Sequence, residues 1–144
     1  MKIRKVNRYY CEFCGKGGCA AGHMKRHEKG CTLNPKRVCG ICGVLKENQK
    51  PIEELTAILP NHELFKVEDQ WQPNGFHYDE KMSDEINKIL PKLRDLAENC
   101  PACIMAALRQ SSTISAARDF HFKEEMKALW EQVNEDRMAS REYY

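Results

Sequence analysis

Six of the eight cysteines in this 144-residue sequence form Cys-x-x-Cys pairs, namely Cys11/Cys14, Cys39/Cys42 and Cys100/Cys103. Two intervening residues allow both sulfurs of a pair to face one metal ion from a tight turn. The basic N-terminus has no apolar segment of the kind found in secretory signals. We therefore expect a cytoplasmic chain, and because disulfides are disfavoured in that compartment, metal binding is the favoured interpretation of the pairs.

The first pair belongs to a longer pattern that also contains a histidine and a third cysteine: Cys11-x2-Cys14-x12-His27-x3-Cys31. This pattern resembles the C2H2 zinc-finger family in its Cys-Cys-His-Cys variant. The resemblance implies a ββα-like module in which a β-turn supplies the first two cysteines and one helix supplies His27 and Cys31 to a single Zn²⁺. His23, four residues earlier on the same helix face, is an alternative ligand, although the twelve-residue spacing favours His27.

Other positions of the finger depart from the family pattern. The family has an aromatic residue where this sequence has Gly18, and its helix leucine corresponds to Met24, while Tyr9 matches the usual aromatic before the first cysteine. A finger without that inner aromatic has a thin core, so we expect it to depend on the rest of the protein or on a partner for rigidity. Cys19 lies outside every pair, and we expect it to be a small buried or free thiol.

The segment Cys39-Gly40-Ile41-Cys42-Gly43 looks like a zinc knuckle, in which glycines permit a tight turn around the sulfurs. Its partner pair is Cys100/Cys103, because no other cysteine pair is free. A long connecting loop adds only a logarithmic entropy cost, so a four-thiolate Zn²⁺ site is feasible here. An iron–sulfur cluster and a redox Cys-x-x-Cys are the alternatives. With four protein ligands, both zinc sites are structural rather than catalytic.

Positive charge is concentrated in the first third of the chain. Residues 1–50 hold 12 Lys and Arg but 3 Asp and Glu, whereas residues 51–144 hold 11 and 18. This asymmetry predicts an anionic partner for the N-terminal region. The side chains expected to contact a nucleic acid are Lys16, His23, Lys25, Arg26 and Lys29. A protein is an equally supported partner, because variants of the finger family that end in cysteine often bind proteins.

The rest of the sequence is mostly helical in pattern. Helices are predicted over residues 52–59, from an N-cap at Ser83, from Pro101, and over residues 116–139 with a Met and Trp stripe in the core. Pro91 either kinks the helix that begins at Ser83 or separates two short helices. Residues 61–82 predict a packed loop or a short hairpin. The predicted fold is mainly α with small zinc-bound β-turns. Residues 1–34 form the finger with a basic arm, and residues 35–144 form a helical domain stapled by the four-cysteine site.

These observations favour a non-enzymatic zinc-binding protein that acts as a nucleic-acid-binding or protein-binding adaptor. One alternative is a phage structural or assembly protein associated with the virion, because the stretches 10–31 and 37–42 resemble small zinc-finger proteins of tailed phages. Another is an HNH-like metal-dependent nuclease, with His62, Asn74 and His77 between the cysteine pairs. However, Asn61 and Phe76 stand where that family has an acid or a histidine. A mean hydropathy of −0.67 argues against a membrane partner, and no small-molecule substrate is expected.

Overall fold

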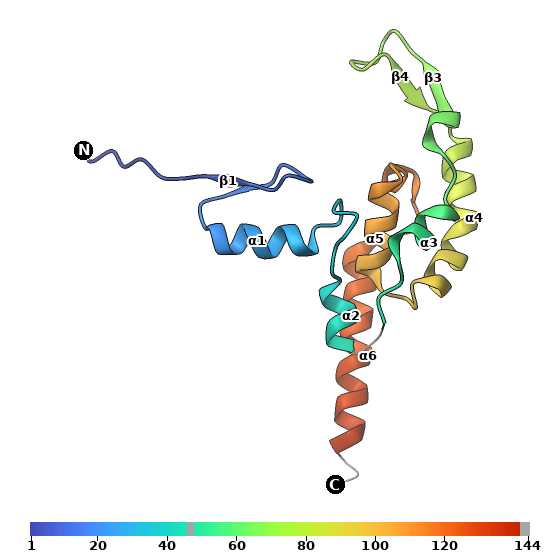
Figure 1. Cartoon of the computed structure of the whole chain (residues 1–144). Helices are drawn as coiled ribbons and strands as arrows, with labels where there is room; N and C mark the ends of the chain where they lie inside the picture. The colour runs from blue at the N-terminus through green and yellow to red at the C-terminus, as the bar shows by residue number, and fades with distance from the viewer. Residues whose placement is uncertain (46–47, 142–144) are drawn as a thin grey trace.

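The computed structural model describes residues 1–45 and 48–141 (Figure 1). Within these residues the chain forms six α-helices, two short 3-10 helices and two small antiparallel sheets. The α-helices are α1 (Ala21–Gly30), α2 (Gly40–Leu45), α3 (Ile52–Ala57), α4 (Lys81–Leu96), α5 (Pro101–Gln110) and α6 (Phe122–Arg141). The mainly helical prediction is confirmed, and none of these described helices has the length and apolar character needed to cross a membrane.

The N-terminal module consists of a minimal hairpin beside one helix. β1 (Tyr9–Tyr10) and β2 (Gly17–Gly18) pair antiparallel, with Tyr9 opposite Gly18. Figure 1 shows the hairpin and α1 lying together and projecting to one side of the other helices. Cys11, Met24 and Cys31 form its buried apolar cluster. Because Gly18 supplies no side chain, this cluster is too small to stabilise the module without further cross-links.

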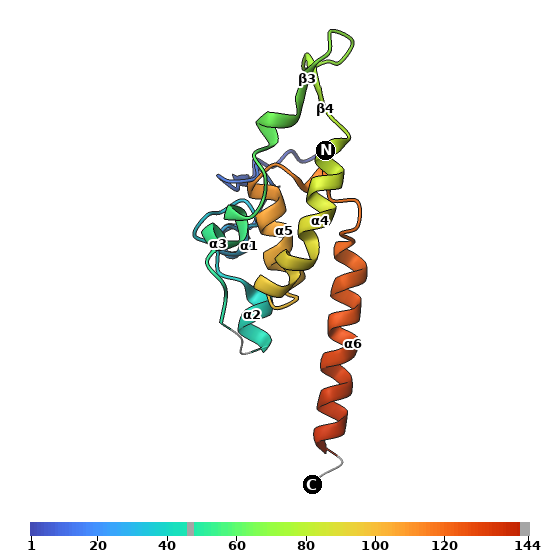
Figure 2. The same cartoon turned by 90° about the vertical axis from the view of Figure 1, so that its right-hand side faces the viewer.

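A larger apolar cluster lies among α3, α4 and α5, and Figure 2 shows these three helices side by side. Leu55 of α3, Leu90 of α4 and Leu108 of α5 are each 1% exposed or less. Apolar residues recur along α4 at three- and four-residue steps, which gives the helix one continuous buried face. Pro91 is on the exposed side of α4, so one helix runs through it.

The start of α4 differs from the prediction. Ser83 is not the N-cap but lies inside the helix, where it is buried. The helix begins at Lys81, whose backbone N–H donates to the Asp79 side chain at 3.0 Å. Asp79 therefore satisfies one of the free N–H groups at the helix start, which is the role that the sequence pattern predicts for Ser83.

Residues 61–82 contain a short hairpin, as predicted for this irregular stretch. The 3-10 helix η1 (His62–Phe65) leads into β3 (Lys66–Glu68), which pairs antiparallel with β4 (Phe76–Tyr78). The connecting loop turns at Gly75, where φ is +78°. The hairpin extends away from the helical core (Figure 1), and Trp71 in its loop is 86% exposed.

The last helix is less buried than the sequence suggested. The apolar spacing predicts a helix over residues 116–139 with a buried Met and Trp stripe, but residues 114–116 form the 3-10 helix η2 and α6 begins at Phe122. None of the α6 residues is fully buried. An ion pair of 2.7 Å between Arg94 and Glu125 fastens its start to α4. In Figures 1 and 2, the C-terminal half of α6 extends beyond the other helices.

Candidate metal centres

The first candidate centre lies between the N-terminal hairpin and α1. Cys11 and Cys14 come from the turn after β1, His27 from the last turns of α1, and Cys31 directly follows that helix. The ligand atoms of these four side chains all lie within 4.8 Å of one another. The turn is closed by a hydrogen bond of 2.9 Å from the Gly15 N–H to the Cys11 carbonyl, and Gly15 has a φ of +72°.

Histidine selection at this centre follows from the helix geometry. His27 Nε2 lies 3.1 Å from the Cys14 Sγ, within the cluster. His23, one turn earlier, is exposed, and its Nδ1 lies 3.0 Å from an Arg26 nitrogen. The structure thus brings together the set that contains His27 and leaves His23 outside it.

Electrostatics differ among the finger thiols. Hydrogen bonds, first from the backbone of Lys16 and then from His27, lower the pKa of Cys14 to about 6. Burial raises the pKa of the Cys31 thiol. Cys14 and His27 are half-buried whereas Cys11 and Cys31 are buried, so one side of the centre is close to solvent. The Cys14 thiolate is therefore available to bind a metal ion at neutral pH.

The second candidate centre joins two helix starts. Cys39 precedes α2 and Cys42 lies within it, while Cys100 occupies the N-cap position of α5 and Cys103 its first turn. Pro101 begins α5, where its missing N–H costs no hydrogen bond. The four sulfurs lie within 4.8 Å of one another, and the Cys39–Cys100 and Cys42–Cys103 separations are 3.6 Å and 3.7 Å.

A sharp turn after α4 delivers Cys100 to this centre. Glu98 and Asn99 both have positive φ angles, 52° and 57°, which reverse the chain between α4 and α5. The Asn99 N–H donates to the Arg94 carbonyl at 2.9 Å and fixes the turn. Asparagine tolerates this left-handed backbone better than most residues, which explains the residue type before Cys100.

All four sulfur-bearing residues of the second centre are buried, with exposures from 0% to 4%. Hydrogen bonds from Cys100 and Cys103 lower the pKa of Cys39, whereas burial raises the pKa of Cys42 to about 12. Without a metal ion, Cys39 is therefore deprotonated more readily than Cys42. A divalent cation at the centre would stabilise all four as thiolates.

Two residues that sequence reasoning missed contact the second centre. Arg37 is 7% exposed, and its Nη1 lies 3.6 Å from the Cys103 Sγ. The Gln49 side chain accepts a hydrogen bond from the Cys39 N–H and donates one of 2.9 Å to the Arg37 carbonyl. Arg37 belongs to a basic stretch that is typical of a surface, and Gln49 lies outside any cysteine motif, so neither carries a local signal.

The remaining predicted site residues lie on the surface of the finger. Lys16, Lys25, Arg26 and Lys29 are exposed, as is His23. Cys19 is exposed and lies outside both cysteine clusters, so it is a free thiol rather than a buried one. Beside Gly18, a groove of about 300 Å³ runs between β2 and α1 and is floored by Met24.

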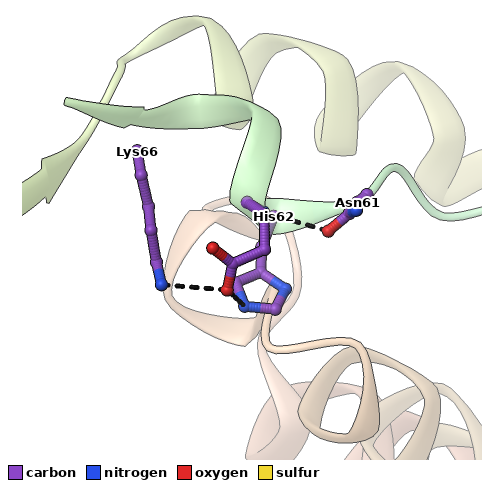
Figure 3. Close-up of polar contacts among 4 residues, drawn as sticks. Asn61, His62 and Lys66 are labelled. Carbon is purple, nitrogen blue, oxygen red and sulfur yellow. Dashed lines mark hydrogen bonds and ion pairs between the residues drawn. The ribbon is translucent and has the colours of Figure 1, made fainter.

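The histidines considered for a nuclease lie outside both cysteine clusters. His62 contacts Glu63 at 3.0 Å, Glu63 also pairs with Lys66 at 2.9 Å, and Asn61 caps this turn (Figure 3). His77 pairs with Asp69 at 3.1 Å on the hairpin. In the described part of the chain, the two cysteine clusters are the groups of three or more His, Cys, Asp or Glu side chains with metal-binding proximity, and His62 and His77 belong to neither.

Comparison of the chain with protein-family models, curated proteins and solved structures finds no match. The functional argument consequently depends on the chemistry of the two clusters and of the surfaces around them. Each cluster offers four ligands of the thiolate and imidazole type, and each could hold one metal ion.

Proposed function

We propose that both centres hold structural Zn²⁺ and that the chain is a non-enzymatic adaptor whose basic finger binds the backbone of a nucleic acid. Cysteine sulfur and histidine nitrogen are the ligands that zinc prefers, and tetrahedral sites built from four of them are closed to substrate. The sets Cys11, Cys14, His27, Cys31 and Cys39, Cys42, Cys100, Cys103 fit that description.

The observation that carries the nucleic-acid proposal is the exposed charge of the finger. Residues 1–34 contain eight Lys and Arg and two Glu, and all eight basic residues are exposed. Glu28 is half-buried and accepts a hydrogen bond of 3.0 Å from the Glu12 N–H. The module projects from the part of the chain that contains α2 to α6, called the body below (Figure 1). An elongated polyanion can therefore reach it. Phosphate contacts of this kind supply most sequence-independent affinity.

The finger offers few side chains that could recognise the bases of a nucleic acid. The helix start of a finger normally reads base edges, but here those positions include Ala20 and Gly22, whose side chains cannot form hydrogen bonds. A single finger also buries a small interface. The proposal is therefore backbone binding with little sequence preference, with Lys16, Lys25, Arg26 and Lys29 as the phosphate-contacting residues.

Fluorescence anisotropy with a labelled 20-base-pair duplex and a matching single strand tests this proposal. Four phosphate contacts to the duplex predict a roughly 150-fold loss of affinity between 50 and 200 mM salt. The double change Lys25→Glu and Arg26→Glu should weaken binding at least tenfold. The matched control, Lys88→Glu with Lys127→Glu, reverses two exposed charges on body helices and should leave affinity unchanged. Absence of binding at 50 mM salt, or equal losses in both variants, overturns the proposal.

Docking on a protein partner is a second candidate function, favoured by the groove beside Gly18. Its floor is the Met24 side chain, and it occupies the place where the finger family carries its own aromatic residue. An apolar side chain of a partner would complete the thin finger core. Such a complex should resist moderate salt and should be lost in a Gly18→Phe variant that fills the groove, whereas nucleic-acid binding should survive that change.

A further inference from the structure

Arg37 is a buried cation beside the four-cysteine centre. Its side chain is 7% exposed, its Nη1 donates toward the Cys103 Sγ at 3.6 Å, and its Nε is buried without a hydrogen-bond partner among the described residues. A buried guanidinium is costly unless a negative charge lies beside it.

The charge that Arg37 faces is that of a metal–thiolate set. Four thiolates around Zn²⁺ carry a formal charge of −2, and this centre has almost no contact with solvent that could screen it. One guanidinium at hydrogen-bond distance of a sulfur reduces that charge to −1 and directs an N–H group at the ligand. Residues that contact metal ligands in this way orient them and tune their binding of the ion.

The backbone of Arg37 lies in the segment that joins the finger to the body, residues 32–39. The far end of α5 holds the start of this segment, because Arg109 donates to the Thr32 hydroxyl at 2.6 Å and Gln110 donates to the Thr32 and Asn34 carbonyls at 2.9 and 3.2 Å. The near end of α5 carries Cys103, which Arg37 contacts. One helix therefore holds the segment at two points that are separated by about two turns of α5.

We propose that Arg37 is the counter-charge of the four-cysteine centre and that, through it, the metal ion at this centre fixes the segment between finger and body. The inference rests on the proposed assignment of Zn²⁺ to the centre. Arg37 acts as a positioning residue, since it contacts the ligand Cys103 rather than the ion. Arg37 thereby links the finger to the helical part of the chain. The ion bound by the four cysteines would also fix residues 32–39, to which the finger is attached.

The test compares three variants of the full-length, zinc-loaded chain: Arg37→Met, which removes the charge and the donors; Arg37→Lys, which keeps the charge; and Lys36→Met, the exposed neighbour, as the matched control. Zinc content by native mass spectrometry and zinc transfer to a coloured chelator report on the centres. Hydrogen exchange of residues 32–39 reports on the segment. Cobalt substitution reports on the sulfurs through their charge-transfer absorption, which a purely structural role of Arg37 would not shift.

We expect Arg37→Met to release one of its two zinc ions about tenfold faster or more, to shift the cobalt–thiolate absorption, and to raise exchange over residues 32–39, while the finger keeps its zinc. Arg37→Lys should restore part of each property and Lys36→Met should match the wild type. Equal behaviour of Arg37→Met and Lys36→Met, with two zinc ions bound to both, overturns the role of Arg37 alone. Failure of the wild type to hold metal at the four-cysteine centre overturns this inference together with the zinc assignment.

Discussion

The two cysteine clusters differ in the sequence span of their ligands, in burial and in the size of the apolar core beside them. The finger cluster draws its ligands from residues 11–31, lies partly at the surface, and has a buried core of three residues. The four-cysteine cluster joins positions 61 apart in the sequence, is buried, and borders a core shared by α3, α4 and α5. In the finger a metal ion would take the place of a core, whereas in the body it would fasten a core that already exists.

Removal of metal should reveal the largest difference between the finger and the helical core. A strong chelator at pH 7 should abolish hydrogen-exchange protection over residues 9–31, because zinc supplies roughly 10–16 kcal/mol of apparent folding free energy to modules of this kind. The buried faces of α4 and α5 should retain protection in the same sample. A finger that stays protected once mass spectrometry shows both ions gone would contradict the distinction.

Single ligand changes should separate the two centres. Cys100→Ser should leave one zinc ion per chain and lower the free energy of unfolding of the body by about 4 kcal/mol, if the entropy of closing this long loop resembles that of a disulfide. Cys14→Ser should also leave one zinc ion but should not change the denaturation midpoint of the body. Both are measured by metal analysis and urea denaturation, and an equal loss of body stability in the two variants would refute the separation.

Acid should affect the finger through Cys14. Because hydrogen bonds from Lys16 and His27 lower the pKa of Cys14 to about 6, its thiolate is available above that pH and is lost as the pH falls through it. The stabilising contribution of this lowered pKa is therefore present at high pH and disappears on acidification. Each pH unit below 6 should therefore add, through Cys14, a further loss of about tenfold to the loss of metal binding that protonation of the other ligands causes. Competition titrations between pH 5 and 8 would show this slope, and a flat profile would contradict it.

The smallest expected effect concerns the thin finger core. A Cβ added at Gly18 would meet the Met24 methyl at 3.4 Å, which is ordinary contact, so Gly18→Phe should cover Met24 and stabilise the zinc-loaded finger by about 1 kcal/mol. A Cβ at Gly17 would approach the Tyr10 ring at 2.9 Å, so Gly17→Ala should destabilise it. Thermal unfolding followed by hydrogen exchange of the finger distinguishes the two variants, and a Gly18→Phe finger less stable than the wild type would contradict the prediction that phenylalanine fills this space favourably.

Local spacing accounts for most of what the sequence could predict. A Cys-x-x-Cys turn and a histidine one turn from a cysteine encode their own geometry, so spacing predicts the finger set and favours His27 over His23. The second set follows only from pairing the two Cys-x-x-Cys segments that remain. Helical periods likewise located α4 and α5.

Features that depend on distant contacts could not be predicted in this way. Ser83 has the side chain and the flanking acids of an N-cap, yet α4 begins two residues earlier, at Lys81, whose N–H donates to the side chain of Asp79 directly after the hairpin. The apolar stripe of α6 is only half-buried, since amphipathic spacing does not reveal how much of a long helix finds a neighbour. Arg37 resembles any other surface cation in the sequence, and only the fold places it against Cys103.

The long span of the four-cysteine centre has a consequence during synthesis. At roughly 5–20 residues per second, a ribosome releases the complete ligand set of the finger about 1 to 4 seconds after its first cysteine. Cys39 and Cys42 wait about 3 to 12 seconds for Cys100 and Cys103, which lie 61 positions later. The finger can therefore bind its metal ion while the chain is still being synthesised. The four-cysteine set is completed later, and until then Cys39 and Cys42 have no partner thiols from the second pair.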